Sequence, residues 1–303
     1  MLDIMVRAGC FISIILLGFI LKKVGFFKDE DFKVLSKIVV KITLTAAIVT
    51  NFSGKEVEPS MFLLTLIGFG FGVVLAFAAY LMNRSRGRQA QAFYMVNTAG
   101  CNVGNFSLPF AQNFLGPVGV MAVGLFDVGN AFICLGGVFG VASVVKDGNG
   151  KFSLKPIFKA LSKSTPFLAC VIMTILCMLH ITLPSPVLQF AEIVGNANAF
   201  LAMFMIGVGF RLSGNSGQLK EIARTLGLRY ALGISLALIT WFFVPFPLEY
   251  KQALVILFLA PLPAAAPAFT SELDGDYGLA SAINSISILI SIALITTALV
   301  LII

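Results

Sequence analysis

The segment NTAGCNVGNFSLP, residues 97–109, brings polar chemistry into an otherwise apolar stretch that runs from residue 90 to residue 115. Its asparagine side chains supply hydrogen-bond donors and acceptors. Its glycines and proline weaken a helix, and backbone freed at membrane depth must be buried in protein or line a wet cavity, because lipid offers no hydrogen bonds. Secondary transporters build substrate sites from such interrupted helices. We therefore expect a substrate-binding site that includes Asn97, Asn102, Gly104, Asn105 and Pro109.

A second group of residues could bind a coupling ion. Asp127 lies near the middle of the apolar run 117–145, and Asn130 follows on the same helix face. An ionisable side chain at that depth costs at least about 2.5 kcal/mol, which is typical of a proton or cation site. A structural pair with Asn130 or with a lysine is an equal alternative. Lys41 either extends to the membrane surface or meets an anionic substrate or Asp127. Asp276 is expected to cap the last helix, and a role in coupling is the alternative.

The same residues give little support to an enzyme. His180 is the only histidine, so no histidine-based metal cluster or HExxH motif is possible. The five cysteines lie in apolar runs without a CxxC pair and are expected to be reduced and buried. An intramembrane hydrolase would need motifs that the chain lacks, and LDGD at 273–276 is not a GxGD. We expect no catalytic residue, no metal and no cofactor, and a proton or sodium as the coupling ion. A channel stays open as a second alternative.

Composition places these residues in a helical membrane protein. The 303 residues are 58% hydrophobic and 12% charged, whereas a soluble domain has about 25% charged residues. Several apolar runs reach the roughly 20 residues that cross a bilayer. Of the expected spans, the fourth and ninth are interrupted and the first, third, fifth and tenth are regular. The runs predict ten spans, at approximately 4–21, 34–52, 61–82, 90–113, 117–145, 165–183, 187–210, 224–245, 251–271 and 277–303.

The positive residues indicate topology rather than a nucleic-acid partner, because lysine and arginine concentrate in alternate loops. Loops one–two, three–four, five–six and seven–eight are basic, and Arg229 is counted at the edge of the last of these. The only basic residues in the opposite loops are Lys55 and Lys251. This distribution puts the basic loops in the cytoplasm and both termini outside the cell.

The lysine-rich connection divides the chain into two halves of five spans, residues 1–145 and 164–303, joined by a cytoplasmic loop at 146–163. An odd number of spans in each half means that the second half is inverted. The interrupted fourth span then corresponds to the ninth, which the sequence PLPAAAP at 261–267 interrupts. Pro263 and Ala264 are therefore added to the substrate site. Half-helices at both breaks present partially positive N-termini to an anion, and we expect no arginine to clamp a carboxylate.

The chain resembles the auxin efflux carrier family of bacterial and plant transporters. NVGNFSLPF (102–110), FLGPVGV (114–120), MIGVGFRL (205–212) and PLPAAAPAFTSELDGDYGLAS (261–281) are similar to that family's patterns. Ser107 stands where the family usually has glycine, and Thr45 where proline is common. The resemblance implies an all-α fold of ten transmembrane helices in two inverted repeats, with crossed broken helices 4 and 9.

The resemblance also implies what is transported. It implies secondary transport, by a homodimer in the inner (plasma) membrane, of small organic anions such as malonate, malate or indole-acetate-like acids. The related bile-acid/sodium symporters supply the alternative, which predicts a sodium site of carboxylate and amide groups around the crossing.

Overall fold

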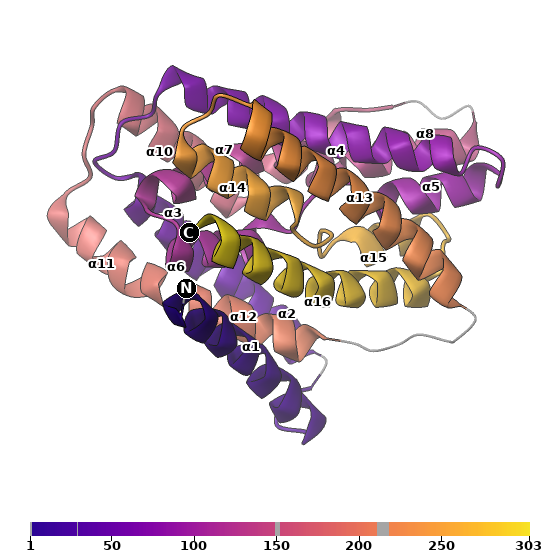
Figure 1. Ribbon diagram of the computed structural model, residues 1–303, viewed down its shortest axis with the longest axis horizontal. Helices are drawn as coiled ribbons and strands as arrows, with labels where there is room; N and C mark the ends of the chain where they lie inside the picture. Colours follow the sequence, from indigo (N-terminus) through magenta and orange to yellow (C-terminus); the bar gives the residue numbers. More distant parts are fainter. Residues whose placement is uncertain (1, 29, 149–151, 211–217) are drawn as a thin grey trace.

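The computed structural model describes residues 2–28, 30–148, 152–210 and 218–303, and every regular element in these ranges is a helix. Figure 1 shows how the helices are arranged. The α-helices are α1 (Leu2–Lys23), α2 (Asp31–Ile38), α3 (Leu44–Phe52), α4 (Phe62–Met82), α5 (Arg88–Val96), α6 (Leu108–Phe114), α7 (Pro117–Phe132), α8 (Val138–Asp147), α9 (Lys155–Leu161), α10 (Thr165–Met178), α11 (Ser185–Asn196), α12 (Asn198–Gly209), α13 (Leu219–Phe243), α14 (Leu248–Phe258), α15 (Ala266–Glu272) and α16 (Tyr277–Ile302).

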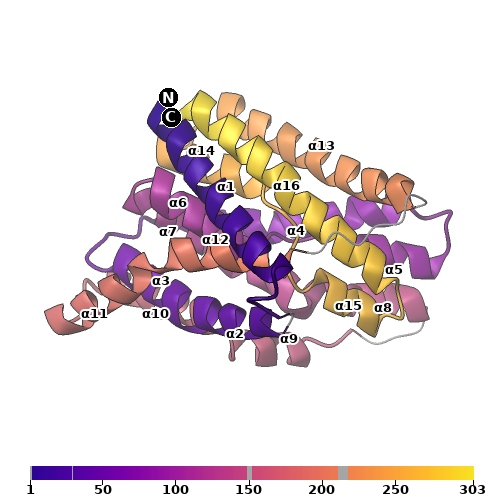
Figure 2. The same cartoon turned by 90° about the horizontal axis from the view of Figure 1, so that it is seen from below.

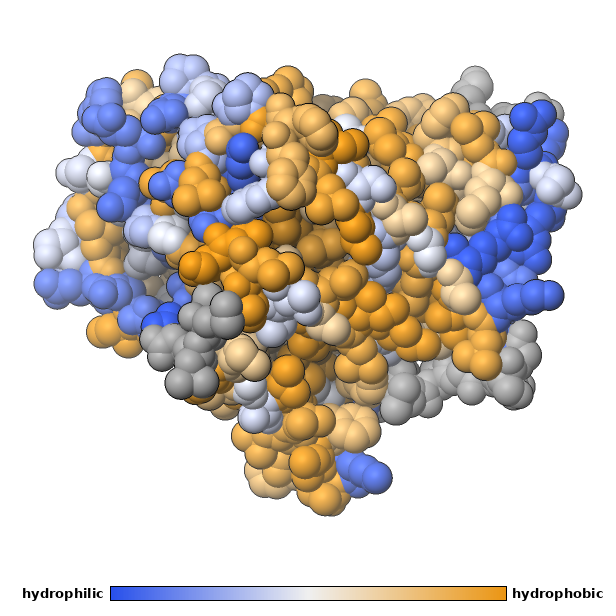
Figure 3. Space-filling model, viewed as in Figure 1, coloured by the Kyte–Doolittle hydropathy of each residue, from blue (hydrophilic) through white to orange (hydrophobic). Residues whose placement is uncertain are grey.

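Six helical segments of the described chain are long and apolar enough to cross a membrane. They are Met5–Lys23, Pro59–Met82, Pro117–Asp147, Ser185–Gly209, Leu219–Phe243 and Tyr277–Ile302. A bent pair, α9 and α10, with 75° between its helices, is a seventh candidate. On the face seen in Figure 3, apolar residues form a broad band and hydrophilic residues gather at the two ends. The expectation of a multi-pass helical membrane protein is therefore confirmed.

Three short π-helical turns interrupt the regular helices. They are η1 (Val39–Thr43) between α2 and α3, η3 (Val103–Ser107) before α6, and η4 (Ile133–Gly137) between α7 and α8. A π-helical turn accommodates one extra residue in a helix and is common at functional sites. The 117–145 run was expected to be a regular helix, and this expectation was wrong, because Gly136 has φ +139° and bends the chain at η4.

Two other segments are less regular than the apolar runs alone suggest. The predicted connection 146–163 contains helix α9, whose Ile157 and Leu161 are buried against the bend at η4. The predicted span 34–52 stays helical through η1, where the π turn replaces the regular α-helical hydrogen bonds. The hydroxyl of Thr45 donates to the carbonyl of Val40 at 3.2 Å. Thr45 therefore stands in a distorted helix rather than at a full break.

Helix packing brings distant parts of the sequence together around the centre of the molecule. α1 packs along α12, and α4 packs along α7. The beginning of α1 lies beside the end of α16 in both views (Figures 1 and 2). The packed interior contains both interrupted helical segments, α5 to α6 and α14 to α15. The fold thus places the polar segment 97–109 where the sequence predicts it, inside the apolar layer.

Candidate functional site

The first break lies between α5 and η3, at residues 97–102, and it coincides with the predicted polar segment. The α-helix ends at Val96, and Gly100 adopts φ +79°, a conformation that glycine tolerates and most residues do not. The helix resumes at Val103 after Asn102. The N–H groups of Cys101 and Asn102 thus leave the helical hydrogen-bond pattern inside the protein and bond to other segments.

The second break lies between α14 and α15, at residues 259–265, where Pro261 and Pro263 prevent a regular helix. The two breaks meet directly, because the backbone N–H of Asn102 donates to the carbonyl of Pro261 at 2.9 Å. Gly100 also touches the second break, since a Cβ atom built on it would lie 2.9 Å from Cγ of Pro263. The fourth and ninth predicted spans are therefore joined at their interruptions.

Asn130 on α7 replaces the hydrogen bonds that the first break lacks. Its Oδ1 accepts from the backbone N–H of Cys101 at 2.9 Å, and its Nδ2 donates to the carbonyl of Cys101 at 3.0 Å. The same Nδ2 donates to Oδ1 of Asp127 at 2.9 Å. The side-chain amide of Asn130 thus bonds to both backbone groups of Cys101. It also connects the first break to the carboxylate of Asp127. The predicted proximity of Asp127 and Asn130 is confirmed.

Side chains of α16 stabilise the second break. Ser291 donates to the carbonyl of Leu259 at 2.7 Å, and Asn284 donates to the carbonyl of Pro263 at 2.9 Å. Ser287 accepts from the backbone N–H of Leu262 at 3.3 Å. These three polar residues lie at helical spacing on one face of α16, and their bonds explain why polar groups occur in that apolar helix.

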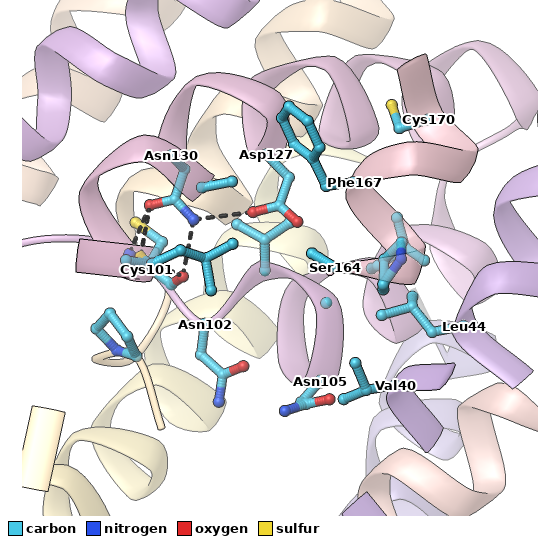
Figure 4. Close-up of a pocket in the computed structure, with 18 of the residues that line it drawn as sticks. Val40, Leu44, Cys101, Asn102, Asn105, Asp127, Asn130, Ser164, Phe167 and Cys170 are labelled. Atoms are coloured by element: carbon cyan, nitrogen blue, oxygen red, sulfur yellow. Dashed lines mark hydrogen bonds between the residues drawn. The ribbon is translucent and has the colours of Figure 1, made fainter. Parts of the chain in front are cut away.

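A cavity of about 190 Å³ lies beside the first break (Figure 4). Asn102 and Asn105 lie together at the bottom of the close-up, and Asp127 and Asn130 lie at the top. Among the described residues, no hydrogen-bond partner is found for the side chain of Asn102 or for the buried Oδ1 of Asn105. These amides are therefore available to a molecule in the cavity. The lining also includes Gly104, Pro263 and Ala264, together with Val40, Leu44, Ser164, Phe167 and Cys170.

Four predicted site residues lie away from this lining. Asn97 is fully buried and donates to Thr270 on α15 at 2.7 Å, so it links the two interrupted segments. Pro109 is buried in the first turn of α6. Lys41 is exposed on η1. Asp276 caps α16 by accepting from the N–H of Leu279 at 2.9 Å, as predicted.

Arg229 on α13 corrects one sequence-based expectation, namely that it lies at the edge of a loop. Its side chain is 0% exposed. Its guanidinium donates to the carbonyls of Thr98 in the first break and of Ala260 and Pro261 in the second. A signal was available, because residue 229 falls inside the predicted span 224–245, and charged residues within spans usually have a function.

A second cavity, of about 500 Å³, follows the same faces of α3 and α6 beyond the first. Asn51, Gln112, Glu192 and Asn196 are among its lining residues. Buried Asn198 accepts from Thr43 at 3.0 Å and donates at 3.0 Å to Gln112, which lines the second cavity. The polar residues Glu192 and Asn196 line the second cavity and not the first.

Comparison with known proteins bears on what this arrangement does. Residues 10–148 match the family model described as "Membrane transport protein", which is the auxin efflux carrier family domain. No curated protein sequence matches the chain. The matched residues include the first break, Asn130 and Asp127. The family is one of transporters rather than enzymes. Residues 10–148 thus carry the membrane-transport domain of the auxin efflux carrier family.

Proposed function

We propose that the protein is a secondary active transporter of small organic anions, such as mono- or dicarboxylates, that works by alternating access around the two breaks. The observation that carries this proposal is the cavity at the first break, where Asn102 and Asn105 present amides without hydrogen-bond partners in the described chain. The N-terminus of the continuous η3–α6 helix begins at this cavity, and its free N–H groups favour an anion.

The proposed topology has ten spans in two inverted halves, residues 1–145 and 164–303. The six long segments and the bent pair supply seven spans, and the interrupted segments 31–52, 88–114 and 248–272 supply three more. The family match ends at residue 148, close to the boundary that the lysine-rich connection predicts. We propose that both termini lie outside the cell, which the basic loops support, and that the membrane is the inner (plasma) membrane, on the family resemblance. We also propose a homodimer, on the family resemblance alone.

Alternating access requires a path from the substrate cavity to each side of the membrane. The second cavity continues along α3 and α6 toward the end of the molecule opposite the basic loops. The Thr43–Asn198–Gln112 bonds separate it from the first cavity. In this proposal the second cavity is the outer vestibule, and these three side chains form part of the barrier that opens during transport.

Uptake into liposomes that contain the purified protein tests the proposal. Malonate, malate and indole-3-acetate are the substrates, each with an imposed proton or sodium gradient. We expect saturable uptake of at least one acid. Asn102→Ala removes an amide that bonds to a charged ligand and should raise KM about tenfold or more. Gln189→Ala, at an exposed position on α11, is the control. Uptake that is absent for every acid, or unchanged in Asn102→Ala, contradicts the proposal.

The second candidate function is sodium-coupled symport of the bile-acid symporter type, and the Asp127–Asn130 pair favours it. The carboxylate of Asp127 and the carbonyl of Cys101 both lie beside Nδ2 of Asn130, and both provide oxygen atoms, which hard cations prefer. Sodium-driven uptake that Asp127→Asn abolishes would support this candidate. Proton-driven uptake that Asp127→Asn uncouples would instead identify Asp127 as a proton site. Normal coupled transport by Asp127→Asn would exclude Asp127 from coupling altogether.

A further inference from the structure

Arg229 places a positive charge where the two breaks meet. Two of its bonds, to the carbonyls of Ala260 and Pro261, measure 2.8 and 3.2 Å, and a third joins it to the carbonyl of Thr98. Its side chain is fully buried, and an arginine side chain stays protonated in proteins. The charge is therefore a permanent feature of the interior.

No carboxylate of the described residues neutralises this charge directly. The ion pairs found there within 4.0 Å are Arg86–Glu221 and Lys146–Asp274, which lie elsewhere. Three peptide carbonyls stabilise the guanidinium, and its Nε has no hydrogen-bond partner in the described part of the chain. Burying a charge without a counter-ion is costly, so a fold that keeps one gains something other than stability from it.

The charge lies directly behind the wall of the substrate cavity. Nη2 of Arg229 is 3.7 Å from the sulfur of Cys101, and Cys101 lines the cavity. Of the described side chains in that lining, the only one that carries a full charge is Asp127, which is negative when ionised. Asp127 alone would oppose the entry of an anion. A nearby buried positive charge acts strongly here, because the interior screens charges much less than water does.

We propose that Arg229 determines the charge preference of the cavity: its positive charge, held behind Cys101, offsets Asp127 and makes the cavity accept an anion. This inference rests on the proposed function and adds a specificity-determining residue to it. Arg229 does not touch the substrate. It acts through its field, and it also fixes the carbonyl groups of both breaks so that they point away from the bound anion and toward the guanidinium.

Pairs of ligands that differ in charge but hardly in shape test this inference. Binding of indole-3-acetate and indole-3-acetamide, and of malonate and malonamide, is measured on the purified full-length protein. The proteins compared are the unmodified chain, Arg229→Lys and Arg229→Gln. We expect the unmodified protein to prefer the acid to its amide. Arg229→Gln should lose about tenfold or more of that preference, whereas Arg229→Lys, which keeps the charge, should retain most of it.

The ratio of the two affinities separates charge from structure, because a purely structural role would weaken acid and amide equally. The double variant Arg229→Gln, Asp127→Asn removes one charge of each sign and should recover part of the preference. An unchanged ratio in Arg229→Gln overturns the inference. If Arg229→Gln does not fold, loss of the preference in folded Arg229→Lys overturns it, and retention supports it. No preference for acids in the unmodified protein contradicts the proposed function instead.

Discussion

Arg229 bonds to carbonyls of both breaks, but otherwise the two breaks are stabilised differently. Asn130 pairs with both the N–H and the carbonyl of a single residue of the first break, Cys101. Asn284, Ser287 and Ser291, spread along α16, each bond to a different residue of the second break. Apart from Arg229, the first break therefore depends mainly on Asn130, and it borders the cavity amides. Three side chains of α16 bond to the second break, so the loss of one of them should disrupt that break less.

Asn130→Ala should have the largest effect on this comparison. The substitution leaves the buried N–H of Cys101 without a partner, at a cost of about 1–3 kcal/mol, and leaves its carbonyl only the weak bond from Sγ of Cys134 at 3.7 Å. We expect a large drop in Tm and loss of transport, measured by thermal unfolding in detergent and by liposome uptake. Asn113→Ala removes an amide whose bond is to the carbonyl of Pro109 within its own helix, and it serves as the control. Equal Tm values for the two variants would refute the special role of Asn130.

Gly100→Ala should have the next largest effect, because the two breaks come together at this residue. Its Cβ would lie 2.6 Å from Sγ of Cys134 and 2.9 Å from Cγ of Pro263, and φ is +79°. Left-handed backbone and overpacking together should cost about 2–5 kcal/mol. Gly25→Ala has φ +84° with nothing within 4 Å of the new Cβ, so it measures the backbone part alone. A Tm loss in Gly100→Ala no larger than in Gly25→Ala would show that the breaks separate easily.

Ser287→Ala tests whether the second break tolerates the loss of one bond. The N–H of Leu262 loses its acceptor, which should cost about 1–3 kcal/mol, less than the change at Asn130. Ser107→Ala is the matched control in η3, directly after the first break, because the hydroxyl of Ser107 is buried and has no partner among the described residues. Removing it should leave Tm unchanged or raise it. A larger loss in Ser107→Ala than in Ser287→Ala would reverse this assignment.

The smallest expected effect concerns the C-terminal end of the second interrupted segment. Asp274 follows α15 and pairs with Lys146 at the end of α8 at 2.7 Å. The ammonium group lowers the pKa of the Asp274 carboxyl below its usual value. A lowered pKa in the folded state adds stability above the unfolded-state pKa of about 3.9, and this stability disappears as the pH falls through the lower folded value.

Asp274→Asn should therefore lower Tm slightly near pH 7, and the difference from the unmodified protein should vanish in acid. Thermal unfolding at a series of pH values measures this difference. The pair is exposed, so added salt should also reduce it. A Tm difference that persists in acid would show that the substitution acts through something other than the ion pair.

Much of this arrangement could be predicted from the sequence, because its signals are local. Glycine and proline mark both breaks, Asn130 follows Asp127 by one helical turn, and Asp276 precedes the helix that it caps. The bonding partners could not be predicted in this way. The hydrogen bonds from Asn130 to Cys101 and from Arg229 to Pro261 join residues far apart in the chain, and they depend on how helices pack. The role of Arg229 could not be predicted for the same reason: it lies inside α13, whose first residue, Leu219, precedes the predicted start of the span at 224.

The three π-helical turns give the cavity wall an adjustable register. Residues of η1, η3 and η4 all line the cavity. Each such turn holds one residue more than the α-helix needs. If a turn closed to regular α-helix, the residues beyond it would rotate by about 100° and advance by about 1.5 Å, since those are the steps of an α-helix. A side chain facing the cavity would then face a neighbouring helix. The set of side chains that line the cavity can therefore change while every helix stays folded.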